Sequence, residues 1–90
     1  MVLDLYRDRY ELYLVILREA KRSGAEGIKF TSLMYRTYMS FQQMTDTANF
    51  LVDNGMLIVV ENKFFITDKG REFYDIIQQM NELVVFDRLS

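Results

Sequence analysis

The most constraining feature of the sequence is residues 39–55, a segment that contains both a helix start and a helix stop. The hydroxyl of Ser40 can accept a hydrogen bond from a free amide of the first turn, and Gln43 can reach back to the Ser40 amide, which makes a capping box. Gly55 supplies the stop, because glycine tolerates the left-handed conformation that commonly follows a helix. The sequence therefore predicts a helix over residues 40–54.

The predicted helix has one apolar and one polar face. Its apolar residues recur at helical spacing, and we expect all of them to point inward: Phe41, Met44, Ala48 and Leu51. The other face consists mainly of amides and hydroxyls, which are side chains that hydrogen-bond base edges in DNA. A solvated polar face is the simpler interpretation of this helix taken alone, since polar surface helices are common.

Length and composition narrow the class of protein. Ninety residues make one small domain, and a hydrophobic fraction of 50% is enough for a core. The chain has no cysteine and no histidine, which removes disulfides, the usual zinc ligand sets and histidine-based catalytic triads. It also has no glycine-rich phosphate loop of the P-loop kind. We therefore expect no enzyme, no metal and no other cofactor.

The N-terminal part predicts a helix over residues 4–23. Aromatic and aliphatic side chains share one face of it, namely Tyr6, Tyr10, Tyr13, Leu17 and Ala20. Residues 12–17 are apolar on every side, which a helix on the surface of a monomer does not need. Either a partner covers the second face or the core surrounds the helix. This run is too short to span a membrane, and no signal peptide precedes it, so we expect a cytoplasmic protein without membrane contact.

A second, shorter helix is predicted before the capped one. Residues 23–27 form a glycine-containing break, and residues 28–30 are a candidate short strand. Thr31 or Ser32 can cap a helix that runs through Tyr38, with Leu33 and Met34 as its inward residues. Only a short turn then separates it from the helix over 40–54, an arrangement typical of a helix-turn-helix.

The pattern changes after Gly55. Residues 56–60 and 64–67 are apolar and β-branched or aromatic, and the polar residues 61–63 between them predict the turn of a hairpin. A hairpin directly after a helix-turn-helix is a wing. Phe65 cannot share a face with Phe64 and Ile66, so it packs under the first or last helix or is exposed at a partner surface.

The C-terminal part predicts a long helix that Thr67 can cap. Its apolar stripe is Phe73, Ile76, Ile77, Met80, Leu83 and Val84. The stripe is longer than a core of this size requires, which points to a partner helix. We therefore expect one domain over residues 1–90, with residues 68–86 as a dimerisation helix.

Three stretches resemble the small archaeal winged-helix DNA-binding proteins. Residues 31–41, TSLMYRTYMSF, resemble T-R-I-M-Y-K-A-N-L-S-Y of that family; residues 53–57, DNGML, resemble E-K-G-L-I; and residues 64–73, FFITDKGREF, resemble Y-x-I-T-x-K-G-x-E-F. The similarity covers residues 8–80, and relatives of this type include regulators, chromatin-associated proteins and proteins of archaeal viruses. The resemblance implies an α+β winged helix-turn-helix fold.

The resemblance also implies a function, namely sequence-specific binding of double-stranded DNA by a homodimeric transcriptional regulator, at the nucleoid or in the host cytoplasm for a viral protein. Helix 40–54 would enter the major groove and the wing, 61–63, would lie on the backbone. The candidate base-reading residues are Gln42, Gln43, Thr45 and Asn49, and the candidate phosphate contacts are Lys29, Thr31, Ser32, Arg36 and Lys63. The candidate dimer interface is Leu12, Val15, Ile16, Phe73, Ile76, Ile77, Met80, Leu83 and Val84.

Charge is the main departure from the family. Ser32 stands where relatives have a basic residue, and Thr45 and Asp46 stand where they have lysines. Residues 39–55 contain no Lys or Arg, and the whole chain has a formal charge of −2 and a pI near 5.0. Since DNA affinity depends on cations that neutralise phosphates, the alternative is a protein-protein interaction module that has lost DNA binding.

Overall fold

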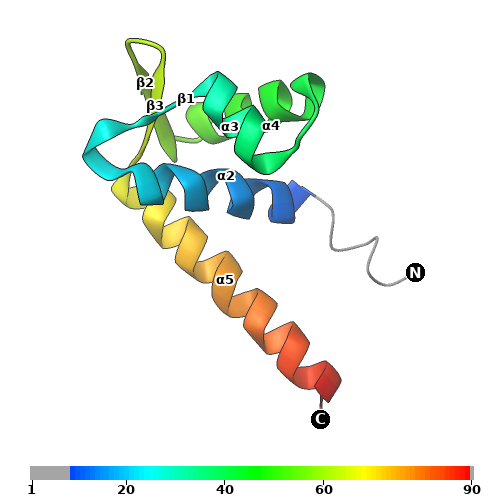
Figure 1. The fold of residues 1–90 in the computed structure, drawn as a ribbon. Coiled ribbons are helices and arrows are strands. Elements are labelled where there is room, and N and C mark those ends of the chain that lie inside the picture. Colours follow the sequence, from blue (N-terminus) through cyan, green and yellow to red (C-terminus); the bar gives the residue numbers. More distant parts are fainter. Residues whose placement is uncertain (1–8, 90) are drawn as a thin grey trace.

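The computed structural model describes the backbone of residues 9–89 and the side chains of residues 9–80. The elements are α2 (Arg9–Ser23), the 3-10 helix η1 (Gly24–Glu26), β1 (Ile28–Lys29), α3 (Phe30–Thr37), α4 (Phe41–Asp53), β2 (Leu57–Val60), β3 (Lys63–Ile66) and α5 (Asp68–Leu89). This is the predicted α+β order. Figure 1 shows α3, α4 and the β2–β3 hairpin on one side of α2 and α5 on the other. The predicted helix start, at residues 4–8, lies outside the described part.

Helix α2 is the centre of the core. Ile16 and Leu17 are fully buried, and Tyr13 and Ala20 are buried beside them. Leu12 and Leu14 are half-buried against the same core. Because α2 lies between the other helices, most of the apolar surface of α2 is buried in the chain's own core. Ile16 is thus a core residue, and its predicted place in a dimer interface is wrong.

Local signals set both ends of α4 as predicted. The Ser40 hydroxyl accepts a hydrogen bond from the Gln43 amide (3.1 Å), and Gln43 Oε1 accepts one from the Ser40 amide (3.3 Å), which completes the capping box. At the other end Gly55 has a φ of 75°, and its amide donates to the Val52 carbonyl at 3.0 Å. The next amide, that of Met56, donates to the carbonyl of Leu51 at 2.8 Å, which gives a Schellman motif.

The inward face of α4 differs from the predicted stripe at one position. Met44, Ala48 and Leu51 are buried as expected, but the side chain of Phe41 is 66% exposed. Thr47 is buried in addition. The reason is tertiary: the first turn of α4 extends past the edge of the core, where the rings of Phe41 and Phe30 meet edge-on.

Helix α3 begins earlier than predicted. It follows β1 directly and starts at Phe30, with Lys29 at the N-cap and no side-chain cap, so the predicted cap at Thr31 or Ser32 is wrong. Both residues instead occupy the first turn. The helix ends at Thr37, and its C-cap, Tyr38, takes the left-handed conformation with a φ of 59°. Leu33 is its fully buried residue, as predicted.

The sheet is antiparallel with the order β1-β3-β2. Glu61 and Asn62 form the hairpin turn, and their φ values of 51° and 67° are those of a type I′ turn. Lys63, predicted in the turn, is the first residue of β3. The ring of Phe65 lies against the residue that precedes β1. It covers Gly27, where an added Cβ would lie 2.6 Å from the ring.

The cap of α5 connects it to the end of α4. Thr67 Oγ1 accepts a hydrogen bond from the Gly70 amide at 3.0 Å, as predicted, and donates one to the Gly55 carbonyl at 2.7 Å. Tyr74 and Ile77 are buried, and Lys21 of α2 lies 4.9 Å from the ring centroid of Tyr74. No helix in the described part of the chain is long and apolar enough to cross a membrane.

Burial along α5 corrects the predicted stripe. Ile77 is only 4% exposed and belongs to the core, so it is not available to a partner, whereas Ile76 and Met80 are 54% and 58% exposed. Leu83 and Val84 lie outside the described side chains. The helix continues to Leu89, beyond the predicted end at 86, and Figure 1 shows its second half running away from the other elements.

Candidate nucleic-acid interface

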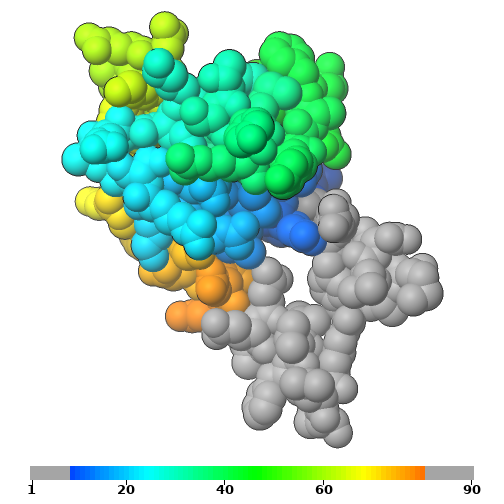
Figure 2. All heavy atoms as spheres, in the orientation of Figure 1, coloured from blue at the N-terminus to red at the C-terminus, as the bar shows by residue number. Residues whose placement is uncertain are grey.

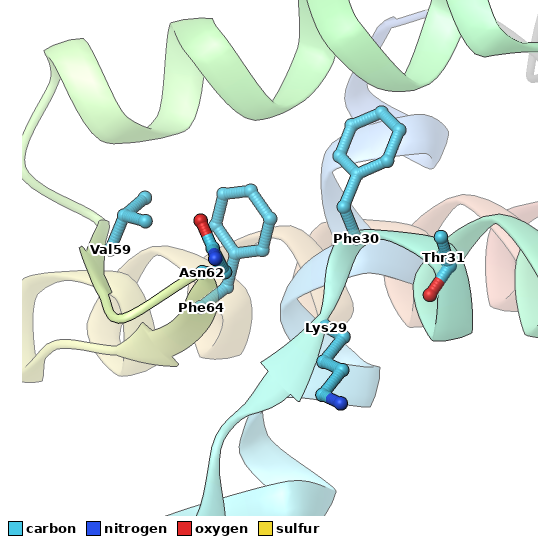
Figure 3. Close-up of a pocket in the computed structure, with 6 residues that line it drawn as sticks. All are labelled: Lys29, Phe30, Thr31, Val59, Asn62 and Phe64. Atoms are coloured by element: carbon cyan, nitrogen blue, oxygen red, sulfur yellow. The ribbon is translucent and has the colours of Figure 1, made fainter.

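Three elements meet around a groove beside α4. The groove is lined by Lys29, Phe30, Thr31, Val59, Asn62 and Phe64, which come from β1, the start of α3 and the hairpin. In Figure 3 the rings of Phe30 and Phe64 point toward α4, whereas Lys29 points away from it. The hairpin tip stands out from the surface next to α3 in Figure 2. The start of α3 and the hairpin line this groove, and the first turn of α4 joins the same surface where the ring of Phe41 meets that of Phe30.

The side of α4 that faces α2 is not part of this surface. Phe50 lies there, with its ring stacked on Tyr13 at 4.5 Å between centroids. Gln43 also lies there: its carbonyl oxygen is used in the capping box, and the residue lines a separate groove with Leu12 and Arg36. Gln43 was predicted to read bases, but the structure separates it from Gln42 and Asn49 and gives it a capping role.

The outward side of α4 carries Phe41, Gln42, Asp46 and Asn49, all of them exposed. Gln42 Nε2 donates to both carboxylate oxygens of Asp46, at 3.0 and 3.1 Å. The fourth predicted base reader, Thr45, is half-buried, and its hydroxyl oxygen is enclosed without a partner among the described residues. The sequence did not identify Phe41 as a residue of the outward face, because its spacing from Met44 matched the apolar stripe.

Electrostatics distinguish α4 from the sheet. The exposed surface of α4 carries the carboxylates of Asp46 and Asp53 and no cation. Across the β1–β3 pair, however, Lys29 and Lys63 are direct partners in the register. Directly opposed side chains in an antiparallel pair share a face, and like charges there repel each other. A bound anion would offset this repulsion, so the two lysines are a candidate phosphate contact next to the hairpin tip.

The remaining predicted phosphate contacts are divided between two places. Thr31 is exposed and lines the groove, and Ser32 is half-buried in the same turn. Arg36 instead contacts Glu19 of α2 at 3.4 Å.

In the part of the chain that the structure describes, no group of three or more acidic side chains is placed to hold a metal ion.

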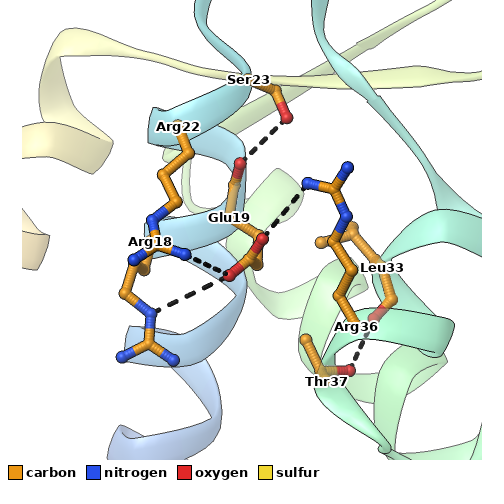
Figure 4. A network of polar contacts seen from close by, with 7 residues as sticks. All are labelled: Arg18, Glu19, Arg22, Ser23, Leu33, Arg36 and Thr37. Carbon is orange, nitrogen blue, oxygen red and sulfur yellow. Dashed lines mark hydrogen bonds and ion pairs between the residues drawn. The ribbon is translucent and has the colours of Figure 1, made fainter.

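Glu19 is a buried carboxylate that the sequence analysis did not single out. Figure 4 shows it among three arginines, with ion-pair distances of 4.0 Å to Arg18, 3.5 Å to Arg22 and 3.4 Å to Arg36. Its position on the buried face of α2, amid basic residues, is the signal that could have identified it. The contact between Glu19 and Arg36 joins α2 to the end of α3, so Arg36 serves the fold.

We expect Arg36→Ala to lower the free energy of unfolding by about 0.5–1 kcal/mol, because the ion pair is half-exposed and screened by solvent. Urea unfolding measures the change. The affinity of the folded variant for nucleic acid should stay within about twofold of the wild-type affinity. A variant of unchanged stability that binds nucleic acid tenfold more weakly would contradict the structural role of Arg36.

Residues 6–84 match a protein family described as winged helix-turn-helix. The match spans α2 to α4, the hairpin and most of α5. Neither the comparison with curated proteins nor the comparison with solved structures gave a match.

Proposed function

Because the chain belongs to the winged helix-turn-helix family, we propose that it binds double-stranded DNA sequence-specifically, as a homodimeric transcriptional regulator in the cytoplasm. The observation that carries the proposal is the placement of α3, α4 and the hairpin on one side of α2 (Figure 1), with Phe41 of α4 in contact with Phe30 at the groove between α3 and the hairpin. In helix-turn-helix proteins the second helix enters the major groove. Here that helix is α4, and the hairpin tip then meets the backbone beside it.

The proposed surface divides its contacts by chemistry. Phosphate contacts fix the position of a protein on the duplex, and base contacts specify the sequence. We assign the first role to Lys29, Lys63 and Thr31, which lie beside the hairpin and at the start of α3. We assign the second role to the exposed row on α4, with Asn49 and Gln42 as its polar members.

We base the proposed homodimer on the outer part of α5. Ile76 and Met80 are one helical turn apart and exposed, on a helix that extends away from the rest of the chain (Figure 1). A second copy of α5, related by a two-fold axis, would cover both side chains. The two α4 helices would then face successive major grooves about 34 Å apart. Leu12 and Val15 line the groove toward α3 and α4, so we leave them out of this interface.

DNA binding should depend only modestly on salt. With the lysine pair as the main cations of each protomer, we expect the slope of log K against log salt concentration to be about −3 to −5 for a dimer. Lys29→Ala or Lys63→Ala should weaken binding to all duplexes alike and make the slope less steep by about 2. Fluorescence anisotropy at several salt concentrations measures both quantities. Arg22→Ala, which removes the same charge from α2, is the matched control and should leave the slope unchanged.

Base reading should show a different signature. Asn49→Ala should cost about 1–3 kcal/mol on the preferred site and little on random DNA. A site preference that survives Asn49→Ala and Gln42→Ala together would remove α4 as the reader.

A protein-binding module is the second candidate. It is favoured by the acidic α4 and by three exposed aromatic side chains near the α3–α4 turn, those of Tyr35, Tyr38 and Phe41. The same titrations separate the two candidates. If no duplex binds at low salt, even from a pool of random sequences, the DNA proposal fails and the protein-binding module is favoured.

A further inference from the structure

The exposed ring of Phe41 is held in a defined position at the start of α4. It meets Phe30 edge-on, with centroids 5.7 Å apart and an interplanar angle of 65°, and Phe30 in turn lies 6.3 Å from Phe64. The three rings form a row from the sheet to the first turn of α4. Exposing a phenylalanine forgoes the stabilisation that burial would provide. The core does not need this side chain, so a role at the surface is the better account.

Phe41 also occupies the leading end of the row proposed to meet DNA. Residues 41, 45 and 49 are successive i, i+4 neighbours, so they line one side of α4. The N-terminal residues of a recognition helix are the ones that contact base edges in the major groove. Phe41 is the first residue of α4, and Asn49 lies two turns further along the same side.

The side chains of this face match some bases and not others. Guanine is read most often by Arg or Lys on its O6 and N7 atoms, and residues 40–54 contain neither. A carboxylate can accept from the amino group of cytosine, but both oxygens of Asp46 are engaged by Gln42. Asparagine and glutamine pair with N6 and N7 of adenine, and phenylalanine contacts the C5-methyl group of thymine.

We propose that α4 reads A·T base pairs, with Phe41 against a thymine methyl group and Asn49 on adenine, since the Nε2 donor of Gln42 is engaged by Asp46. The preferred half-site is therefore A·T-rich where α4 meets it. This inference rests on the proposed DNA binding and adds the class of sequence that the surface recognises.

The test begins with selection of the preferred duplex from a random pool. Each thymine of that site is then replaced by deoxyuridine, which removes only the C5-methyl group. We expect wild-type affinity to fall about three- to fivefold for each contacted thymine, the value of one buried methyl group. Phe41→Ala should lose the same factor on the normal site and show no further loss with deoxyuridine, since the two changes remove one contact.

Two further variants sharpen the test. Tyr35→Ala removes an exposed aromatic side chain from α3 and should keep the full deoxyuridine effect. Replacing the contacted adenine by 7-deazaadenine, which lacks N7, should weaken binding of the wild type. The same replacement should leave the affinity of Asn49→Ala unchanged. Circular dichroism and thermal melting confirm that each variant is folded, which the exposure of these side chains leads us to expect.

The outcomes separate this inference from the proposed function. Duplex binding with a G·C-rich preferred site, or with no loss on deoxyuridine substitution, overturns A·T reading and leaves DNA binding intact. A protein that binds no duplex at low salt overturns both. A preferred A·T-rich site whose deoxyuridine effect disappears only in Phe41→Ala supports the inference.

Discussion

Gly70→Ala is expected to destabilise the protein by about 2–3 kcal/mol, because there is no room for a methyl group at this position. A Cβ on Gly70 would clash with the carbonyl oxygen of Met56 and lie 2.8 Å from Cγ1 of Ile66. The carbonyl is backbone and cannot rotate away. The helix start would therefore have to move, and the Thr67 cap that joins α5 to the end of α4 would be disturbed.

The sign of the change in the free energy of unfolding shows whether helix propensity or the steric clash is the larger effect. Helix propensity alone predicts that Gly→Ala stabilises a helix by about 1 kcal/mol, whereas the close approach to Met56 predicts a loss. Thermal unfolding should show a fall in melting temperature of more than roughly 8 °C. Lys69→Ala, at the neighbouring exposed position of α5, is the control and should change stability by less than about 0.5 kcal/mol. A more stable Gly70→Ala variant would show that α5 does not approach Met56 this closely.

Ile77→Glu is expected to unfold the protein at 25 °C. The side chain of Ile77 is buried in the hydrophobic core of the domain. Burying a charge in this way costs more than about 4 kcal/mol, which is most of the stability of a small domain. Loss of the cooperative urea transition and of the far-ultraviolet helix signal would be the readout. A folded Ile77→Glu protein would contradict the position of α5 against α2.

The adjacent substitution, Ile76→Glu, is the matched comparison because its side chain is exposed. We expect this variant to remain folded. Because the introduced charge would lie in the proposed dimer interface, light scattering should show a monomer where the wild type is a dimer. Met80→Glu, one turn further along α5, should behave in the same way. Wild-type protein that is monomeric at high micromolar concentration would exclude the proposed dimer and leave the fold unaffected.

The confirmed predictions about the fold come from interactions within a few residues. The capping box of Ser40 and Gln43, the Gly55 stop and the Thr67 cap each involve groups that are close in the chain, so their residue types are sufficient signals. The order of elements follows from them, and the winged helix-turn-helix family was recognised from the same stretches.

The site was less predictable, because helical spacing does not say where a core ends. Phe41 has the spacing of an inward residue, yet it lies beyond the edge of the core and is exposed. Gln43 was assigned both to the cap and to base reading, and the structure places it on the side of α4 that faces α2. Pairing between strands brought Lys29 and Lys63 together, which no local pattern indicated.

By itself the sequence determined the type and order of the elements and both ends of α4, since those signals act over one helical turn or one hairpin. Only the tertiary structure decided which side chains remain available for binding. Arg36 pairs with Glu19, and Phe65 covers Gly27, because elements far apart in the chain are brought into contact. Such contacts depend on the distances and angles between elements, and these are set by the packing of the whole core around α2.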